Sequence, residues 1–428
     1  MLRGVRRAAG LLLAALFVLA AAGCWDYKEV EDMGHVMLTS VDLTHRGKFC
    51  LRVQVLVPAA LAGGGGAGGM AGGGAARGGG ARKPYRHYLA EADTLFEAFR
   101  DLTTKAPRRL FFAHNQVILV GERLARERGV GPVVDFFERN PQIRRDTWLL
   151  VARGDLKELM DVSSILDPLP GRHILGVVDN RDLSSRVAAT RLGDFVEMLE
   201  SPGREAYTGV VEMVPSETVS RIGLTPGAAG PDPAKDIRIT GAAVFKGDKL
   251  AGFLDNREAR GLLWLRGEVR GGPVEFALPG GGRVAVEILR AGRGAVKLEP
   301  VLSEGRLSMR VRIKTRVNLV EAQAPGLELD KPAVIYGLEE ELSRAIRGEV
   351  EAALARLQGE YRADAFGFGE AVHRRYPRAW RQIKGEWEGY FAALPVEVEV
   401  KTSIRRTGLI KKPLVPKGGD KIKGIQGG

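Results

Sequence analysis

Cysteine is almost absent from this chain of 428 residues, which contains only Cys24 and Cys50. Two thiols cannot form a disulfide framework or a four-ligand thiolate metal cluster. The sequence therefore excludes a disulfide-stapled fold, and it argues against cysteine chemistry at a catalytic site.

Long apolar runs are also missing, because no segment reaches the eighteen or more apolar residues of a membrane-spanning helix. The longest run, Leu11 to Ala22, follows three arginines and would extend only about 18 Å as a helix, against a hydrocarbon core of about 30 Å. This pattern predicts a signal peptide over residues 1–23, with the rest of the chain extracytoplasmic.

The signal ends in Ala21-Ala22-Gly23-Cys24, which resembles a bacterial lipobox, where the cysteine is diacylated and becomes the mature N-terminus. We therefore expect Cys24 to anchor the protein to a membrane, since two acyl chains bind stably where one binds only marginally. The alternative is an ordinary secretory signal in which Cys24 has no role.

Motifs of the common enzyme classes are missing. The chain has no phosphate-binding P-loop, no His-Glu-x-x-His, no Cys-x-x-Cys and no Gly-x-Ser-x-Gly, and its six histidines show no paired ligand spacing. Aromatic residues make up 7% of the chain and do not interleave with its basic residues, so the net charge of +12 does not indicate nucleic-acid binding. We predict no catalytic residue, no metal site and no cofactor.

The N-terminal region, residues 24–224, is expected to be mixed α/β, as one unit or two subdomains. A Gly/Ala-rich tract at 63–82 is expected to be a disordered loop, because its burial would not offset its large ordering entropy. Periodicity and turn signals predict strands at 36–43, 49–57, 110–120, 147–152 and 206–214, and helices at 93–105, 133–139, 171–179 and 192–199.

A run rich in proline and glycine at 225–236 is predicted to be a linker, followed by a C-terminal α+β domain over 237–410 and a flexible basic tail over 411–428. In that domain, apolar and polar residues alternate from Leu307 to Leu319, and an amphipathic helix of about seven turns runs from Leu338 to Tyr361. Further strands are expected at 237–245, 250–254, 284–289, 295–302 and 396–404. The fold class is therefore multidomain α+β, with a C-terminal antiparallel sheet packed against a long helix.

Aromatic residues gather between Asp364 and Phe391, after the long helix. The favoured interpretation is a core-closing element that holds the helix against the sheet. The alternative is an exposed partner-binding surface, whose candidate residues are Phe366, Phe368, His373, Tyr376, Trp380 and Trp387.

The same segment resembles the C-terminal part of the Ger(x)C family, the lipoprotein C subunits of spore germinant receptors. The resemblance rests on Asp-x-Phe-Gly-Phe-Gly from Asp364, a basic stretch with Tyr376-Pro377 and Trp380, and the later Trp387. Two further stretches agree, Gly23-Cys24-Trp25-Asp26 at the expected mature start and the run that begins at Arg109 with Arg-Leu-Phe-Phe-Ala-His-Asn. The Gly-rich tract and the basic tail depart from the family pattern.

The resemblance implies a three-domain α+β lipoprotein at the spore inner membrane, without known catalysis. It would work with A-type and B-type membrane-embedded receptor subunits and be required for nutrient-triggered spore germination. Two other classes stay open: a lipid-anchored substrate-binding protein of a transporter, which requires two lobes of parallel βαβ units, and an exported hydrolase, which requires catalytic groups that converge from distant positions.

Overall fold

The computed structural model describes residues 32–62, 83–162, 167–215, 235–289, 294–324 and 327–406, together with Gly4 and Gly10. Apart from these two glycines, the predicted signal peptide lies outside the described residues. So do Cys24, the Gly-rich tract 63–82, the basic tail 411–428 and residues 225–234 of the predicted linker.

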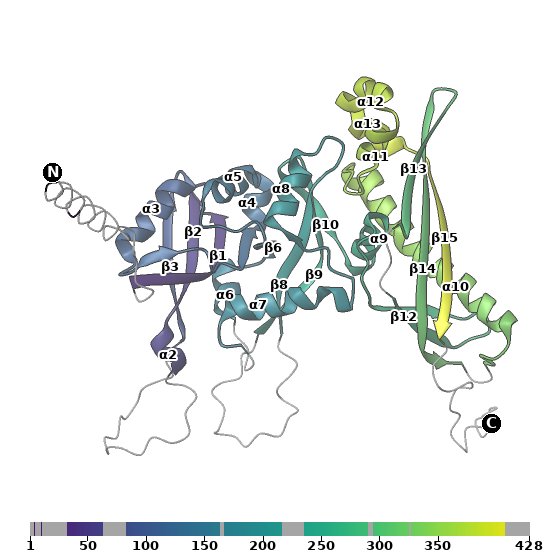
Figure 1. Cartoon of the computed structure of the whole chain (residues 1–428), viewed down its shortest axis with the longest axis horizontal. Coiled ribbons are helices and arrows are strands. Elements are labelled where there is room, and N and C mark those ends of the chain that lie inside the picture. The colour runs from purple at the N-terminus through teal and green to yellow at the C-terminus, as the bar shows by residue number, and fades with distance from the viewer. Residues whose placement is uncertain are drawn as a thin grey trace, which may run out of the picture.

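A mixed sheet of ten strands dominates the first part of the molecule (Figure 1). Its main path runs β10-β9-β8-β6-β5-β1-β2-β3, with β4 beside β1 and β7 beside β6. The strands are β1 (Met33–Leu43), β2 (Phe49–Leu56), β3 (Tyr85–Ala92), β4 (Arg109–Phe111), β5 (Val117–Gly121), β6 (Trp148–Arg153), β7 (Thr190–Arg191), β8 (Tyr207–Pro215), β9 (Lys235–Lys246) and β10 (Lys249–Leu254).

The centre of this sheet is parallel, whereas both edges are antiparallel. Strands β1, β5, β6 and β8 are parallel neighbours, while β2 and β3 at one edge and β9 and β10 at the other are added by antiparallel pairing. The turn between β9 and β10 contains Gly247 at φ +58°, a left-handed conformation that glycine adopts without a steric penalty. This mixed order differs from that of a simple doubly wound sheet, whose strands are mostly parallel.

Helices cover both faces of the first sheet, because its central strands are apolar on both sides. In β5, Val117 and Leu119 pack with α6 and α7, while Ile118 and Val120 face the opposite core. Figure 1 shows α6 and α7 below the sheet and α3, α4, α5 and α8 above it. The helices are α2 (Pro58–Ala62), α3 (Leu95–Lys105), α4 (Glu122–Glu127), α5 (Gly131–Arg139), α6 (Leu156–Asp161), α7 (Pro170–Asp179), the 3₁₀ turn η2 (Asn180–Leu183) and α8 (Leu192–Glu200).

The strand predicted over 110–120 is wrong as a single element. The chain forms β4 and β5 with a turn between them, and both strands pair with β1. The polar residues that follow Phe112 explain the break, since Asn115 donates its backbone amide to the Phe112 carbonyl at 2.9 Å. The helix predicted at 93–105 is confirmed, and Thr94 Oγ1 caps it by accepting from the Glu97 amide at 3.2 Å.

The second sheet has five strands built around the 18-residue strand β14. One edge of β14 pairs with β13 and then β12, and the other edge pairs with β15. These pairs are antiparallel except β14–β15, which is parallel and so departs from a purely antiparallel sheet. The strands are β11 (Pro273–Ala277), β12 (Arg283–Ile288), β13 (Val296–Ser303), β14 (Arg306–Gln323) and β15 (Val396–Arg406).

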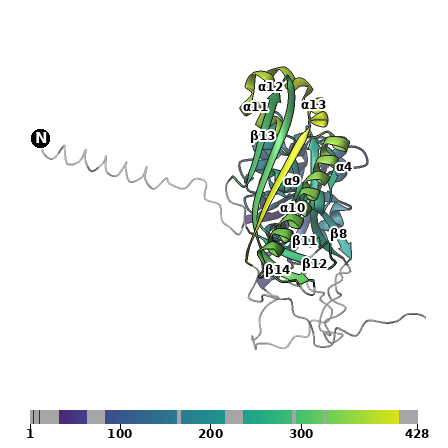
Figure 2. The same cartoon turned by 90° about the vertical axis from the view of Figure 1, so that its right-hand side faces the viewer.

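The predicted long helix is α10 (Pro332–Leu354), continued by the π-helical turn η3 (Ala355–Tyr361). It buries Leu338, Leu342, Ile346 and Val350 at four-residue intervals. Figure 2 shows α10 alongside β15 and next to α9 (Asn256–Arg266). The fold class, multidomain α+β with a sheet packed against a long helix, is thereby confirmed.

The predicted linker at 225–236 does not separate the two sheets. Strands β9 and β10 follow it in sequence, yet β9 pairs with β8 from Tyr207 to Pro215 and extends the first sheet. The chain reaches the second sheet only after α9. Proline and glycine there mark a connection within the first sheet, which composition alone does not distinguish from a domain boundary.

Candidate functional site

The aromatic segment after η3 folds into three short helices, α11 (Phe368–Arg375), α12 (Pro377–Ile383) and α13 (Trp387–Ala393), with the 3₁₀ turn η4 (Lys384–Glu386) before α13. Its phenylalanine rings pack against one another at tilted angles, with the Phe366 and Phe368 ring centroids 5.1 Å apart. The rings of Trp380 and Trp387 meet edge to face at 5.2 Å. Such pairs stabilise a packed core beyond the area they bury.

A buried carboxylate organises this segment. Asp364 Oδ1 accepts hydrogen bonds from the amides of Gly367 and Phe368 at 2.9 and 3.1 Å. Its Oδ2 accepts from the Gly369 amide at 2.8 Å and from Trp387 Nε1 at 3.0 Å. We call these five residues the Asp364 hub. It satisfies the free amides at the start of α11 and fixes Trp387 against that helix.

The electrostatics of the hub involve two opposing effects. Burial raises the pKa of Asp364 from 3.8 to about 6, while the three backbone amides and the indole of Trp387 act in the opposite direction. The four donors are neutral, so no cation balances the charge of the carboxylate within the hub.

The hub also joins the aromatic segment to the first sheet, through the connection between α8 and β8. Glu205 donates its amide to the Asp364 carbonyl at 2.8 Å, and Glu370 donates its amide to the Gly203 carbonyl at 3.2 Å. Gly203 has φ +82°, and a Cβ there would lie 2.6 Å from Trp380 and 2.9 Å from the Gly369 backbone. Only glycine allows this close approach.

The six candidate partner-surface residues divide into two groups. Phe366 and Phe368 are fully buried, and Trp380 and Trp387 are buried as well, so these four close the core and present no surface on this chain. Only His373, which is exposed, and Tyr376, which is half-buried, lie at the surface. A surface built from all six is therefore wrong, because the apolar rings gain more by leaving water.

A second buried contact joins α9 to α10. Arg260 Nε donates to Glu349 Oε2 at 2.9 Å and its Nη2 to Glu349 Oε1, while Trp264 Nε1 donates to Glu349 Oε2 at 3.0 Å. Arg260 and Glu349 are both buried. Gly261 lets the helices touch, since a Cβ there would lie 2.1 Å from the Glu349 carbonyl oxygen. We call this contact the Arg260–Glu349 pair; sequence reasoning missed it, because its partners are distant in sequence and share no motif.

A polar cavity of about 370 Å³ lies between the first sheet and the end of α9, and five arginines line it. Arg204 Nε lies 3.4 Å from Glu370, Arg266 Nε lies 3.4 Å from Glu268, and Tyr207 donates to Glu268 at 2.8 Å. Burial and the nearby Glu268 raise the pKa of Tyr207, which is therefore neutral at physiological pH. The described lining contains no histidine or cysteine, and its arginines and carboxylates make the cavity a source of polar binding contacts.

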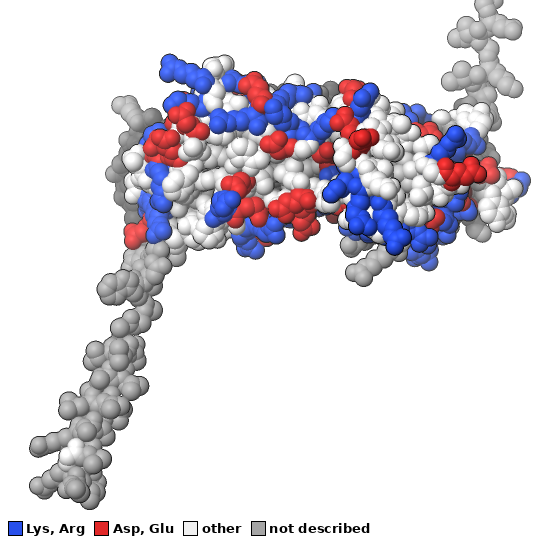
Figure 3. All heavy atoms as spheres, turned by 90° about the horizontal axis from the view of Figure 1, so that it is seen from above, with Lys and Arg blue, Asp and Glu red and all other residues white. Residues whose placement is uncertain are grey.

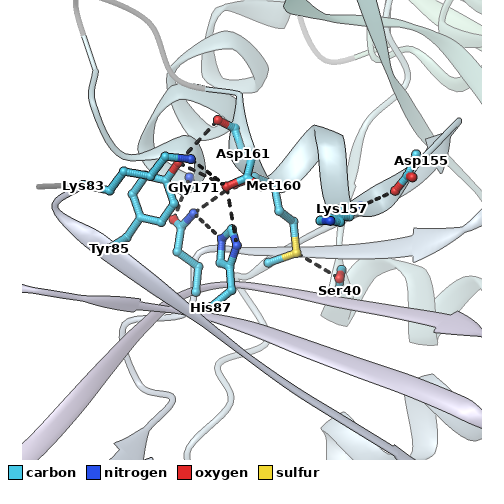
Figure 4. A network of polar contacts seen from close by, with 10 residues as sticks. Ser40, Lys83, Tyr85, His87, Asp155, Lys157, Met160, Asp161 and Gly171 are labelled. Carbon is cyan, nitrogen blue, oxygen red and sulfur yellow. Dashed lines mark hydrogen bonds and ion pairs between the residues drawn. The ribbon is translucent and has the colours of Figure 1, made fainter. Parts of the chain in front are cut away.

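A third polar network ties β2 and β3 to the helices below the sheet (Figure 4). Gln54 accepts from the Gly171 amide at 3.1 Å and lies 3.3 Å from His87 Nε2. Lys83 Nζ and Tyr85 OH both donate to Asp161 Oδ1, at 3.1 and 3.4 Å. Lys83 is the first described residue after the Gly-rich tract, so the network fixes the point at which the chain returns to the sheet.

Metal ligands and charged surface side chains among the described residues bear on two further kinds of site, a metal centre and a basic binding surface. No group of three or more His, Cys, Asp or Glu side chains in the described part of the chain could hold a metal ion. The face shown in Figure 3 carries basic and acidic side chains interspersed. None of the helices in the described ranges is long and apolar enough to cross a membrane.

The fold and the site together define a two-sheet α+β protein in which the Asp-x-Phe-Gly-Phe-Gly motif that begins at Asp364 forms a buried structural hub. A family model described as "Spore germination protein N-terminal domain" matches residues 26–213, and one described as "Spore germination B3/ GerAC like, C-terminal" matches residues 240–408. The chain belongs to this family of spore germination proteins.

Individual relatives align in sequence with this chain over nearly their whole length. Spore germination protein KC of Bacillus subtilis (strain 168) is 27% identical over 419 residues, which cover 96% of this chain and 98% of the relative. Spore germination protein B3 of the same organism is 23% identical over 92% of this chain and 96% of the relative. The crystal structure of the GerBC protein superposes with a TM-score of 0.53 and 21% identity, covering 86% of this chain and 96% of that one, which shows a common fold.

Proposed function

We propose that this chain is a non-enzymatic, lipid-anchored subunit of a spore germinant receptor, required for nutrient-triggered germination. The observation that carries the proposal is the full-length match to relatives that are named as spore germination proteins. The Asp364 hub supports it, because the motif on which the resemblance rests is a connected structural element of this fold.

The proposed site is the spore inner membrane, with Cys24 as the anchor and A-type and B-type membrane-embedded subunits as docking partners. The lipobox-like sequence before Cys24 supports the anchor. A role in docking fits the polar cavity described above, in which Arg204 lies against Glu370 and Arg266 against Glu268. The transporter alternative requires two lobes of parallel βαβ units, and the largely antiparallel second sheet does not provide the second lobe.

Two strains test the proposal, a deletion of the gene and a Cys24→Ala variant expressed from the native locus. We expect the deletion to abolish germination with at least one nutrient, and the variant to lose both membrane retention and that response. Cys50→Ser is the matched control, because this half-buried cysteine lies within β2 and should leave both readouts unchanged. Normal germination of the deletion strain with every nutrient, in the absence of a paralogue, would refute the proposed role.

A further inference from the structure

Helix α3 lies at the end of the molecule farthest from the second sheet (Figure 1), and it carries an exposed phenylalanine. Phe96 is 58% exposed, and the guanidinium of Arg100 lies 4.9 Å from the centre of its ring. Phe99 and Thr103 share this face of the helix because they follow at three- and four-residue intervals. Glu97 and Asp101 fall on another face, so the face that carries Phe96 is apolar and basic.

This face forms one wall of an apolar groove of about 770 Å³, with α5 and the start of β4 on the other side. The apolar residues that line the groove include Leu95, Phe96, Phe99, Leu110, Pro132 and Phe136. An apolar groove beside an exposed aromatic ring is typical of interaction sites, whereas single scattered apolar side chains are not.

The charges at the rim of the groove do not balance. Its two carboxylates are already paired, Asp93 with Lys48 at 3.4 Å and Asp135 with Arg139 at 2.9 Å. Three further arginines at the rim, Arg100, Arg109 and Arg128, have no carboxylate partner among the described residues. The rim therefore favours an anionic partner.

The groove also lies close to the predicted lipid anchor. Strand β1 begins at Met33, whose register partner in β4 is Arg109 at the rim. Met33 lies nine positions after Cys24 in the sequence, and a fully extended chain spans at most about 30 Å over that many residue steps. If Cys24 is acylated, the groove stays within that distance of the bilayer surface.

We propose that the α3–α5 groove rests on the anionic phospholipid surface to which the chain is tethered, with Phe96 at the interface and Arg100, Arg109 and Arg128 against lipid phosphates. The inference rests on the lipid anchor of the proposed function. Exposed phenylalanine beside cations is the composition of interfacial binding surfaces. The contact gives a chain that is attached at one residue a fixed orientation, with the second sheet pointing away from the bilayer.

The test uses the lipidated protein in a Cys50→Ser background, reconstituted into vesicles that contain phosphatidylglycerol or only phosphatidylcholine. A fluorophore is attached at Thr103→Cys, on the groove face of α3, or at Tyr336→Cys, an exposed control position on α10 that is 67% exposed. Nitroxide-labelled lipids quench a fluorophore close to the bilayer, and flotation reports attachment independently.

We expect quenching at position 103 to exceed that at position 336 by about threefold or more in phosphatidylglycerol vesicles, and to fall in phosphatidylcholine, since basic side chains are drawn to anionic lipid. Phe96→Asp and the double variant Arg100→Glu/Arg109→Glu should reduce the difference while flotation is retained. Equal quenching at the two positions in protein that floats would overturn the inference and assign the groove to a protein partner. Protein that does not float with the vesicles is not anchored. That outcome would refute the lipid anchor of the proposed function, and the orientation inferred here would be refuted with it.

Discussion

Two buried carboxylates hold this molecule together, and they are compensated in different ways. Asp364 receives four hydrogen bonds from neutral donors, three backbone amides and an indole. Glu349 faces the guanidinium of Arg260 and the indole of Trp264. The Asp364 carboxylate is stabilised by neutral donors, so its contribution depends on the backbone geometry that presents them. The Glu349 carboxylate is stabilised by one guanidinium, so its contribution depends on a single side chain. We therefore expect substitutions at the two contacts to lower stability by different mechanisms.

The largest effect is expected from Glu349→Ala. It leaves Arg260 buried without its counter-charge, which costs about 4 kcal/mol of unfolding free energy. Chemical denaturation of the purified chain measures the loss. The double variant Arg260→Met/Glu349→Leu removes both charges and should recover most of the stability; a double variant as unstable as the single one would show that packing, not charge, holds α9 to α10.

The Asp364 hub should make stability depend on pH. Its carboxyl has a pKa raised to about 6 in the folded chain, against 3.8 ordinarily. The folded state therefore binds more protons between these values, so the contribution of this group is full below about pH 4 and is lost as the pH rises through about 6, by up to about 3 kcal/mol. Denaturation series from pH 4 to 7 measure the slope.

Asp364→Asn is the control for that slope, because it removes the titrating group. The variant should lose the dependence between pH 4 and 6 that the wild type shows. The variant should also be less stable than the wild type at pH 4. Its NH2 group takes the place of one carboxyl oxygen and cannot accept a hydrogen bond, so donors of the hub are left unsatisfied. A variant whose pH profile follows the wild type would assign the slope to other groups.

A smaller loss, about 2 kcal/mol, is expected from Gly203→Ala. Its Cβ would collide with Trp380 and with the Gly369 backbone, and φ +82° adds strain. Gly47→Ala is the matched control, since Gly47 has φ +75° and nothing within 4 Å of the added Cβ. Thermal unfolding should rank wild type, Gly47→Ala and Gly203→Ala in that order of falling stability; equal losses in the two variants would mean that strain alone explains the effect.

The elements that were predicted well are those in which apolar residues repeat at a regular interval. The helix from Leu338 onwards and the alternating strand from Leu307 were both found because each buries one face along its whole length. The break between β4 and β5 was missed because apolar residues dominate both ends of the stretch, so the short polar stretch around Asn115 that forms the turn was included in one strand.

The candidate site shows the same limit. Composition selected the segment between Asp364 and Phe391, but it left open whether its rings are buried or exposed, because aromatic residues serve both cores and interfaces. The deciding facts are non-local: Gly203 approaches Gly369, and Arg260 meets Glu349 across two helices. No local pattern encodes either pairing, so neither was predicted from the sequence.

Strand β9 belongs to the first sheet although it follows the predicted linker, and this limits where chimaeras of two family members can be joined. The C-terminal family model begins at residue 240, yet β9 and β10 complete the edge of the sheet formed by the preceding half. A chimaera of two relatives joined near that residue would combine a sheet from one parent with edge strands from the other. Exchange between family members should succeed more often when the junction follows α9, where the strands of each sheet come from one parent.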